Sequence, residues 1–342
     1  MIIKLYHPQA VFEIGSRSNQ EDCIYPAAGK ATEDDRFFIL CDGMGGHERG
    51  EVASGAVCQG FSEYFRNHVK SDNLLTDQQL KDALEYAYQQ LDERDNGEFR
   101  KAGTTMTLLY FHRGGCTAAH IGDSRIYHFR PSSRSILYKS RDHSLVFELY
   151  QAGEITYQEM KRHPRKNQIT RAMIAGRDNR QRMDVVHIAN IQPGDYFMIC
   201  SDGILERLDD EELMDLLTDG SSDEQKRRKL VDMTVGNADN HSAYIVHVSD
   251  VQSEDDDDVL LNDEQQVRYN AINIHPTLVD EDEPKAAVGG EQDVNVAEST
   301  QYQPLPQLKS GSRPGWRRKW EVILLLSALI FFLIMLINLI IK

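Results

Sequence analysis

Three apolar segments of this chain, each with the pattern of a buried strand, end in an aspartate that has a glycine as its neighbour. They are residues 37–43, 116–123 and 196–203. A strand of this kind delivers a carboxylate to its end, and the glycine permits a tight turn or a close approach of the backbone. Taken singly, each such pair is equally consistent with an ordinary turn. Taken together, the three segments predict a β-rich body with acidic groups at its strand ends.

The remaining patterns of residues 1–250 predict a mixed fold. Apolar and β-branched runs predict strands at residues 10–14, 36–41, 104–111, 116–121, 124–129, 196–200 and 243–248. Helical periodicity predicts helices at residues 49–68, 77–93, 209–217 and 222–236. The strands follow one another like hairpins and the helices come in pairs, which favours an α+β fold with antiparallel sheets over alternating βαβ units. Residues 144–185 interrupt the pattern and are interpreted as an insertion over a cleft.

Acidic residues dominate the stretch that follows this body. The formal net charge is −16, and residues 251–300 alone hold 14 Asp and Glu against 2 Lys and Arg. Residues 251–315 lack sustained apolar periodicity and are predicted to form an acidic, disordered linker. Residues 1–250 are also acidic, with a net charge of −9. A nucleic-acid-binding face needs clustered Lys and Arg, so this charge argues against nucleic acid as a partner.

The 20 residues from 322 to 341 contain no charged side chain. A helix of this length spans about 30 Å, the thickness of the hydrocarbon core of a bilayer. Basic residues with Trp316 and Trp320 precede the run, and only Lys342 follows it, so the positive-inside rule places the body in the cytoplasm. Residues 316–342 are therefore predicted to be a basic and aromatic flank with a single transmembrane helix. No secretory signal is visible at the N-terminus.

The cysteines form no C-x-x-C pair, and most lie in apolar or small-residue runs. This placement predicts reduced, structural thiols in a reducing compartment. The five residues are Cys23, Cys41, Cys58, Cys116 and Cys200.

Two further acidic motifs accompany the strand-end aspartates. Glu21-Asp22 lies near the start of the chain, and Asp239-Asn240 lies just before the last predicted strand. If these groups converge, like charges raise one another's pKa and cost energy unless cations neutralise them. Oxygen-only ligands select hard cations such as Mg²⁺ or Mn²⁺, and no His/Cys cluster of zinc spacing accompanies them. The sequence therefore predicts a metal centre made of carboxylates.

Six motifs occur in order along residues 8–249. They are Gly15-Ser16-Arg17-Ser18-Asn19-Gln20-Glu21-Asp22, Asp42-Gly43-Met44-Gly45-Gly46-His47, Gly103-Thr104-Thr105, Gly122-Asp123-Ser124-Arg125, Ser201-Asp202-Gly203 and Asp239-Asn240. This series resembles the protein phosphatase 2C (PPM) family of metal-dependent serine/threonine phosphatases. The resemblance implies a four-layer αββα sandwich, with two antiparallel β-sheets flanked by helices. The Met44 form of the second motif is similar to the bacterial branch, which makes the bacterial inner membrane the expected location.

The resemblance also implies roles for individual residues. Asp42, Asp202 and Asp239 are similar to direct metal ligands, with Asp42 bridging two ions. Glu21 and Asp22 match an acidic pair that acts directly or through bound water. The full set of implied metal-binding positions is Glu21, Asp22, Asp42, Gly43 (through its backbone carbonyl), Asp123, Asp202 and Asp239. Asp123 looks like the residue that, with Asp202, holds a third and weaker ion in bacterial members.

Arg17 occupies the position of a phosphate-binding, catalytic arginine in this family, and its planar fork suits bidentate contact with phosphate oxygens. A surface salt bridge is the alternative for this residue. The stretch Gln168-Ile169-Thr170-Arg171-Ala172-Met173 resembles the segment that follows the variable flap of the family. The charged residues before it are therefore expected to form a flap that shapes the choice of phosphopeptide.

Hydrolysis of a phosphomonoester needs a nucleophile at neutral pH and charge neutralisation on the transferred group. Two Mn²⁺ or Mg²⁺ ions provide both, by lowering the pKa of a bridging water for in-line attack. The prediction is a membrane-tethered phosphatase that acts on phosphoserine and phosphothreonine in proteins, with a serine/threonine kinase as its counterpart. The alternatives are an inactive phosphatase-fold scaffold that binds phosphoproteins, and a phosphatase for small phosphoesters.

Overall fold

Two antiparallel sheets form the centre of the protein in a computed structural model that describes residues 1–45, 48–70, 74–94, 103–176, 180–252 and 273–275. These residues belong to the first of two compact units of the chain, Met1–Glu283 and Pro284–Lys342. The first sheet contains β1 (Ile2–Leu5), β2 (Gln9–Glu13), β8 (Arg125–Arg130), β9 (Ser135–Lys139), β12 (Tyr196–Cys200) and β13 (His241–Gln252). Its strand order is β1-β13-β12-β8-β9, and β2 also pairs with β13.

The second sheet carries the other strands. They are β3 (Asp22–Tyr25), β4 (Phe37–Met44), β5 (Gly103–Thr104), β6 (Met106–His112), β7 (Gly115–Ile121), β10 (Met173–Ile174), β11 (Asp184–Ile188) and β14 (Asn273–His275). Their order is β10-β5-β4-β6-β7-β11-β14, and β3 pairs with β4. Every residue of β6 and β7 is buried, because these central strands are covered on both faces.

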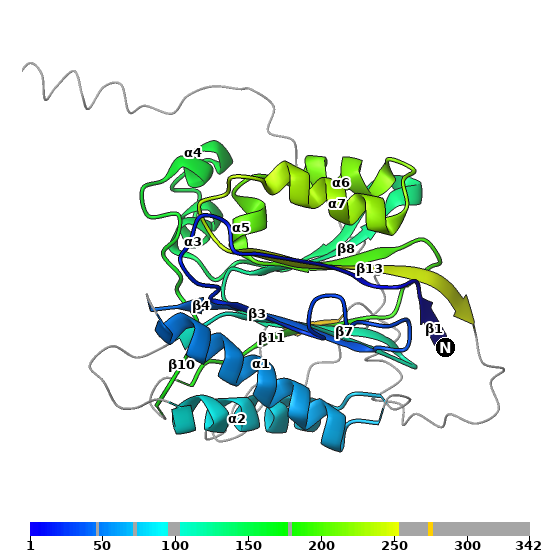
Figure 1. Cartoon of the computed structure of the whole chain (residues 1–342), viewed down its shortest axis with the longest axis horizontal. Helices are drawn as coiled ribbons and strands as arrows, with labels where there is room; N and C mark the ends of the chain where they lie inside the picture. Colours follow the sequence, from blue (N-terminus) through cyan, green and yellow to red (C-terminus); the bar gives the residue numbers. More distant parts are fainter. Residues whose placement is uncertain (46–47, 71–73, 95–102, 177–179, 253–272, 276–342) are drawn as a thin grey trace, which may run out of the picture. The chain divides into compact units, whose positions relative to one another are not determined.

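Helices cover the outer faces of both sheets (Figure 1). The second sheet is covered by α1 (Glu48–His68) and α2 (Asp77–Arg94), and the first by α5 (Asp202–Leu205), α6 (Asp210–Thr218) and α7 (Asp223–Thr234). A short 3₁₀ turn, η1 (Pro131–Ser133), joins β8 to β9. The buried side chains form three clusters, one between the sheets and one between each sheet and its helices. The predicted αββα sandwich is therefore confirmed.

Aromatic rings from both sheets meet in the middle layer of the core. The Phe111 ring packs edge-on against Phe38 of its own sheet, with 6.2 Å between centroids, and against Phe197 of the first sheet, at 5.1 Å. Phe38 also lies 5.1 Å from the Tyr244 ring. Each aromatic side chain buries a large apolar area, so this cluster holds the sheets face to face.

Every strand and helix predicted within residues 1–250 is present, with ends shifted by a few residues. The insertion at 144–185 holds two short helices that were not predicted, α3 (Leu145–Gln151) and α4 (Tyr157–Arg162). We call residues 145–168 the flap. Strands β1, β3, β9, β10 and β11 and the short helix α5 were not predicted either. The five cysteines are free, as predicted.

The predicted linker at 251–315 contains some regular structure. β13 extends to Gln252, and β14 pairs with β11, placing Ile274 opposite Val186. Three residues cannot show a period of two, so the sequence offered no sign of β14. The other residues of the linker, and the whole predicted transmembrane segment at 322–341, lie outside the described residues. Among the residues that are described, no helix combines the length and apolarity that a membrane crossing requires.

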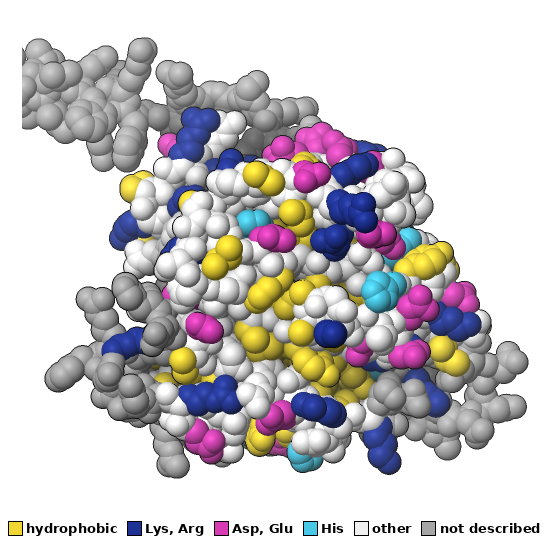
Figure 2. Space-filling model, in the orientation of Figure 1, with side chains coloured by type: hydrophobic (Ala, Val, Ile, Leu, Met, Phe, Trp, Pro, Cys, Tyr) yellow, Lys and Arg dark blue, Asp and Glu magenta, His cyan; other side chains and the backbone are white. Residues whose placement is uncertain are grey.

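One face of the described residues carries side chains of both charges. On the face shown in Figure 2, Lys and Arg side chains lie interspersed with Asp and Glu, and apolar side chains gather near the middle. Interspersed charges cancel beyond a short distance, so this face does not present a field of a single sign.

Candidate metal centre

Asp22 and Asp42 lie directly opposite each other where β3 pairs with β4. The next residue of β4, Gly43, donates its backbone N–H to the Glu21 carbonyl oxygen at 3.1 Å. A Cβ at Gly43 would lie 2.2 Å from the Gly50 carbonyl oxygen, so only glycine fits between β3 and α1. Like charges on opposite residues of a strand pair repel each other. The register of this pair thus places two acidic motifs in mutual repulsion.

The threonines after residue 103 fix the backbone of Asp42. The Thr105 N–H donates to the Asp42 carbonyl at 2.8 Å, and Thr105 Oγ1 accepts the Asp42 N–H at 3.0 Å. Thr104 Oγ1 donates to the same carbonyl at 2.9 Å. Thr105 Oγ1 also lies 2.7 Å from Ser124 Oγ, beside Asp123. One short segment therefore connects Asp42 to the motif that follows β7.

The first sheet contributes acidic residues at two neighbouring strand ends. Asp202 begins α5 directly after β12, and Asp239 lies just before β13. Between them, Ser201 Oγ accepts the Ser242 N–H at 3.0 Å and donates to Asp22 Oδ2 at 3.1 Å. This hydrogen bond crosses from one sheet to the other, and it brings the acidic ends of both sheets together.

Asn240 ties the N-terminal motif to the same place. Its Oδ1 accepts the Glu21 N–H at 2.8 Å, and its Nδ2 donates to the Ile14 carbonyl at 2.8 Å. A Cβ at Gly203 would lie 2.1 Å from the Asn240 carbonyl oxygen. The Asn of the Asp-Asn motif and the Gly of the Ser-Asp-Gly motif therefore have structural roles beside the acidic groups.

Arg17 lies at the rim of this centre. Its Nη2 donates to Asp239 Oδ2 at 2.7 Å, and the Arg17 side chain is 49% exposed. The loop that carries it is held by a hydrogen bond from the Ser16 N–H to the Asn237 carbonyl at 3.0 Å. This geometry is consistent with both hypotheses for Arg17, a phosphate-binding residue and a surface salt bridge. An ion pair holds its guanidinium beside the acidic residues, while half of the side chain faces solvent.

The aspartates from both sheets raise one another's pKa values. Burial, together with the charges of Asp202 and Asp239, raises the pKa of Asp22 to about 7. Burial and the charge of Asp239 raise the pKa of Asp202 to about 6. The pKa values of Asp42 and Asp123 are raised well above their ordinary range, first by burial and then by Asp22 and Asp202 respectively. Without a cation, these groups resist full ionisation at neutral pH.

Two oxygens of the cluster are buried without a hydrogen-bond partner, namely Asp22 Oδ1 and Asp123 Oδ1. A buried acceptor that lacks a partner is costly, and a bound cation satisfies it. All side-chain donor atoms of the cluster are carboxylate oxygens, which suit hard divalent cations. The residues present therefore fit Mn²⁺ or Mg²⁺.

The implied metal-binding positions are all described, and the structure brings them to one end of the two sheets. They are Glu21, Asp22, Asp42, Gly43, Asp123, Asp202 and Asp239. Sequence reasoning missed the side chains that hold these residues in place, such as Thr105, Ser201 and Asn240. The motifs contained them, but only the structure shows their hydrogen-bond partners.

A cavity of about 240 Å³ opens beside Asp123 and Asp202. The flap residues Met160, Lys161 and Lys166 line its other side. The expected cleft beneath the insertion is thus present, and it adjoins the acidic cluster.

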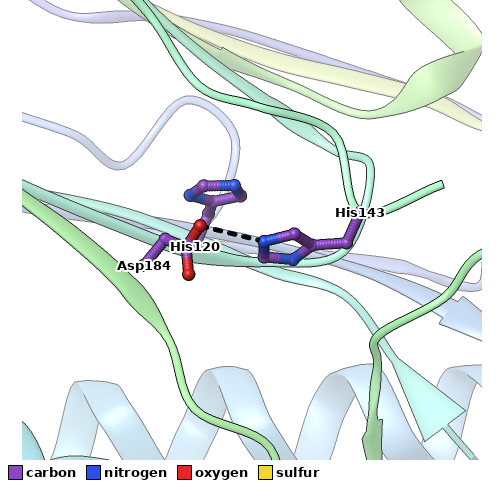
Figure 3. Close-up of side chains that lie close together, drawn as sticks. All are labelled: His120, His143 and Asp184. Atoms are coloured by element: carbon purple, nitrogen blue, oxygen red, sulfur yellow. Dashed lines mark hydrogen bonds and ion pairs between the residues drawn. The ribbon is translucent and has the colours of Figure 1, made fainter. Parts of the chain in front are cut away.

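A second cluster was not predicted. Figure 3 shows His120 of β7, His143 and Asp184 of β11, whose nitrogen and oxygen ligand atoms lie within 4.8 Å of one another. The two imidazole rings are stacked, with 4.7 Å between centroids and 12° between planes. Imidazole lone pairs lie in the ring plane, so two stacked rings do not aim at one ion. We interpret this cluster as a hydrogen-bond network. Its members come from distant segments, so no local spacing could reveal it.

Comparisons with known proteins agree with this geometry. A sequence model described as protein phosphatase 2C matches residues 16–234. A protein of the phosphatase 2C type from Streptococcus pyogenes is 32% identical over 239 residues, which are 68% of this chain and 92% of that protein. The PPM Ser-Thr phosphatase MsPP from Mycobacterium smegmatis, crystallised with cacodylate, superposes with a TM-score of 0.60 at 27% identity, over 72% of this chain and 99% of that chain.

The catalytic domain of the serine threonine protein phosphatase PstP, crystallised with 2 manganese ions, also superposes with a TM-score of 0.60. It is 26% identical and covers 73% of this chain and 100% of its own. The sequence model spans the acidic motifs from Glu21-Asp22 to Ser201-Asp202-Gly203, and the superposed structures cover almost three quarters of the chain. This chain therefore belongs to the protein phosphatase 2C (PPM) family, and to its bacterial type.

Proposed function

We propose that the acidic centre is the active site of a protein serine/threonine phosphatase that depends on Mn²⁺ or Mg²⁺. The observation that carries the proposal is the mutual electrostatic repulsion of four aspartates from two sheets, the buried Asp22 and Asp123 and the half-buried Asp42 and Asp202. Such a concentration of like charge is stable when divalent cations neutralise it. The phosphatase activity of the relatives named above and the manganese ions of PstP support the same conclusion.

We assign individual ligand roles by similarity to the motifs of the family. Asp42, Asp202 and Asp239 would bind the two principal ions, with Asp42 shared between them. Glu21 and Asp22 would act directly or through water, and the Gly43 carbonyl would complete the set. Asp123 and Asp202 line the same cavity, which supports a third and weaker ion between them.

The bound ions supply a water nucleophile of lowered pKa and neutralise the charge of the phosphoryl group. The residues of the chain orient the substrate for in-line attack. Arg17 is held beside Asp239 with its fork partly free, so it can donate two hydrogen bonds to phosphate oxygens. The cavity between the flap and α5 would receive the peptide residues next to the phosphorylated side chain.

The function is tested by phosphate release from phosphothreonine peptides in Mn²⁺ or Mg²⁺. We expect Asp42→Asn to reduce turnover by at least about a hundredfold, because even residues that only orient metal ligands cost 10–100-fold when replaced. The matched control is Asp215→Asn, which removes a carboxylate from an exposed ion pair on α6. Activity that survives Asp42→Asn or chelation would overturn the mechanism.

The same assay separates the two alternatives. Turnover of small phosphoesters without turnover of phosphopeptides would assign the centre to a metabolite phosphatase. Binding of phosphoproteins without release of phosphate would assign the chain to a scaffold. Both outcomes would contradict the proposed protein phosphatase.

We further propose that residues 322–341 anchor this phosphatase in the bacterial inner membrane, with the catalytic body in the cytoplasm. The uncharged run and its basic, Trp-containing flank support this proposal. An acidic tether would let the body range over the membrane surface, at a raised effective concentration near membrane-bound phosphoproteins. A serine/threonine kinase that phosphorylates the same substrates is the expected counterpart.

A further inference from the structure

One residue holds both backbone polar groups of Gly122, which directly precedes Asp123. The backbone N–H of His143 donates to the Gly122 carbonyl at 3.0 Å, and the ring atom Nδ1 of His143 accepts the backbone N–H of Gly122 at 3.0 Å. Gly122 has a φ of +111°, and a Cβ there would lie 2.6 Å from Thr105 Cγ2. These contacts fix the backbone conformation of Gly122, and that conformation sets the orientation of the next residue, Asp123.

The other side of the His143 ring faces the second sheet. Because Nδ1 accepts the Gly122 N–H, the ring proton must be on Nε2. Nε2 therefore donates to Asp184 Oδ2, at 3.1 Å (Figure 3). The second oxygen of this carboxylate, Asp184 Oδ1, accepts from Arg171 Nη1 at 2.9 Å. A continuous chain of hydrogen bonds thus runs from Gly122 through His143 and Asp184 to Arg171.

Arg171 follows the flap, and His143 precedes it. The Thr170 N–H donates to the His143 carbonyl at 2.8 Å, and the Leu145 N–H donates to the Gln168 carbonyl at 2.9 Å. An isolated β-bridge joins residues 144 and 169 between these two bonds. The flap therefore enters and leaves the body at His143, and the same residue holds the turn that carries Asp123.

His120 keeps the His143 ring in place. It is 1% exposed and stacks on His143, and its Nε2 lies 2.8 Å from the Arg141 carbonyl. Burial and the neighbouring His143 lower the pKa of His120 to about 4, so this ring is neutral at pH 7. A neutral, packed ring leaves His143 little freedom to rotate away from Gly122.

We propose that His143 is a positioning residue that sets the Asp123 carboxylate for a weak divalent cation and couples that cation to the base of the flap. The inference rests on the proposed function for the meaning of the cation, but its own test does not use catalysis. Asp123 Oδ1 is buried without a partner, so the position of this carboxylate, more than its contacts within the protein, determines how well it binds an ion.

Two isosteric variants separate the two sides of the ring. In His143→Asn the amide oxygen keeps an acceptor near Nδ1 for Gly122, and the donor to Asp184 is lost. In His143→Gln the amide nitrogen keeps a donor near Nε2, and the acceptor for Gly122 is lost. We measure Mn²⁺ binding to the full chain in detergent by calorimetry and electron paramagnetic resonance, with Asp123→Asn as the variant that removes the weak ion.

The expected result for binding is a difference between these variants. His143→Gln lowers the affinity of the weak site for Mn²⁺ by about tenfold. This is the lower end of the loss seen when a residue that orients metal ligands is replaced. His143→Asn stays within about threefold of the wild type because the Gly122 acceptor is kept. The affinity for the more tightly bound ions is unchanged in both variants. Equal affinity of both variants and the wild type for the weak ion would overturn the positioning role.

The coupling is measured by hydrogen exchange at the flap base. In the wild type, filling the weak site slows exchange of the Thr170 and Leu145 amides. This slowing disappears in His143→Asn and in Arg171→Met, and persists in Arg171→Lys, which retains a cation for Asp184. Slowing that persists in Arg171→Met would overturn the coupling. If a His143 variant fails to fold, the comparison of Arg171→Met with Arg171→Lys still tests the coupling.

The two hypotheses fail in different ways. A wild-type chain without phosphatase activity but with the expected Mn²⁺ pattern contradicts only the proposed function. An active phosphatase whose His143 variants bind Mn²⁺ like the wild type contradicts only the role of His143.

Discussion

At the scale of single residues, Asp22 is unusual because its carboxyl group takes up a proton near neutral pH. Its pKa rises from 3.8 to about 7 because it is buried and because Asp202 and Asp239 lie nearby. A carboxyl whose pKa is raised by folding stabilises the fold only while it is protonated. Its contribution is complete below pH 4 and is lost as the pH rises through 7.

We predict that the metal-free protein is destabilised through Asp22 as the pH rises from about 4 to about 7. Relative to Asp22→Asn, the free energy of unfolding of the wild type should fall by up to about 1.4 kcal/mol per pH unit until the carboxyl is ionised. Urea unfolding in chelator measures this difference. The contributions of titrating groups far from Asp22 cancel between the two proteins, whereas the pKa of Asp42, which Asp22 raises, also changes in the variant. Mn²⁺ should abolish the trend, and a difference that is constant with pH would contradict the predicted titration.

Arg17 permits a second prediction at this scale, because it contributes little to the fold. Its pair with Asp239 is half exposed, and such pairs are worth about 0–1 kcal/mol. We expect Arg17→Ala to leave thermal stability almost unchanged and to lower kcat/KM for phosphopeptides by about 10–100-fold, since a charged hydrogen bond is worth about 1.5–3 kcal/mol.

Arg17→Lys should recover only part of this loss, because an ammonium cannot form the bidentate contact. The matched control is Arg134→Ala, which breaks an exposed Arg–Asp pair with Asp215 on α6. Steady-state kinetics with an unchanged kcat/KM in Arg17→Ala would show that the arginine is only a surface ion pair.

At the scale of elements, the flap is held by its own caps and by ion pairs to the body. Thr156 and Glu159 form a capping box at the start of α4. At the far end of the flap, Lys166 Nζ lies 2.8 Å from Glu206 Oε1, and Lys161 Nζ lies 3.6 Å from Asp209 Oδ2. Both acidic partners flank the cavity beside Asp202. These pairs hold the flap against the segment between α5 and α6.

We predict that Lys166→Glu opens the flap side of the cavity by repelling Glu206. The exposed pair contributes up to about 1 kcal/mol, so KM for phosphopeptides should rise by about two- to fivefold. Turnover of p-nitrophenyl phosphate, which has no peptide to seat, should be nearly unchanged. The swapped double variant Lys166→Glu/Glu206→Lys should restore peptide KM, and failure of this rescue would show that the pair does not hold the flap.

The elements also show what a sequence can predict. β4 and β12 were predicted because each is a continuous apolar run that ends at an aspartate. β3 was missed although it carries Asp22, because four residues that begin with a charge have no period to detect. The acidic centre was predicted from residue types and motif order. The network of His120, His143 and Asp184 was missed because only the folded sheets bring these residues together.

At the scale of the whole molecule, the sequence predicts a membrane anchor that the described residues do not include. We predict that the full chain sediments with membranes and resists carbonate extraction, because residues 322–341 are uncharged. Replacing Leu329 and Ile334 by Lys should release it, since a charge near the centre of a span costs about 2.5–3.5 kcal/mol.

Phosphatase activity should persist in the released variant, which is the control for folding. Replacing Lys309 and Lys342 by Leu serves as the matched change, since it alters two charges without interrupting the apolar run. A wild-type chain that stays in the supernatant, or a double-lysine variant that still resists extraction, would contradict the anchor.

The position of β13 in the first sheet has a consequence for synthesis on the ribosome. β13 pairs with β1, β2 and β12, and Asp239 and Asn240 lie just before it. A nascent chain that stops before residue 239 lacks Asp239, which pairs with Arg17. It also lacks Asn240, whose amide holds the N-terminal loop, and the whole of β13. Such a fragment lacks one of the implied metal-binding residues and a strand that pairs with three others, so we expect it to have no phosphatase activity.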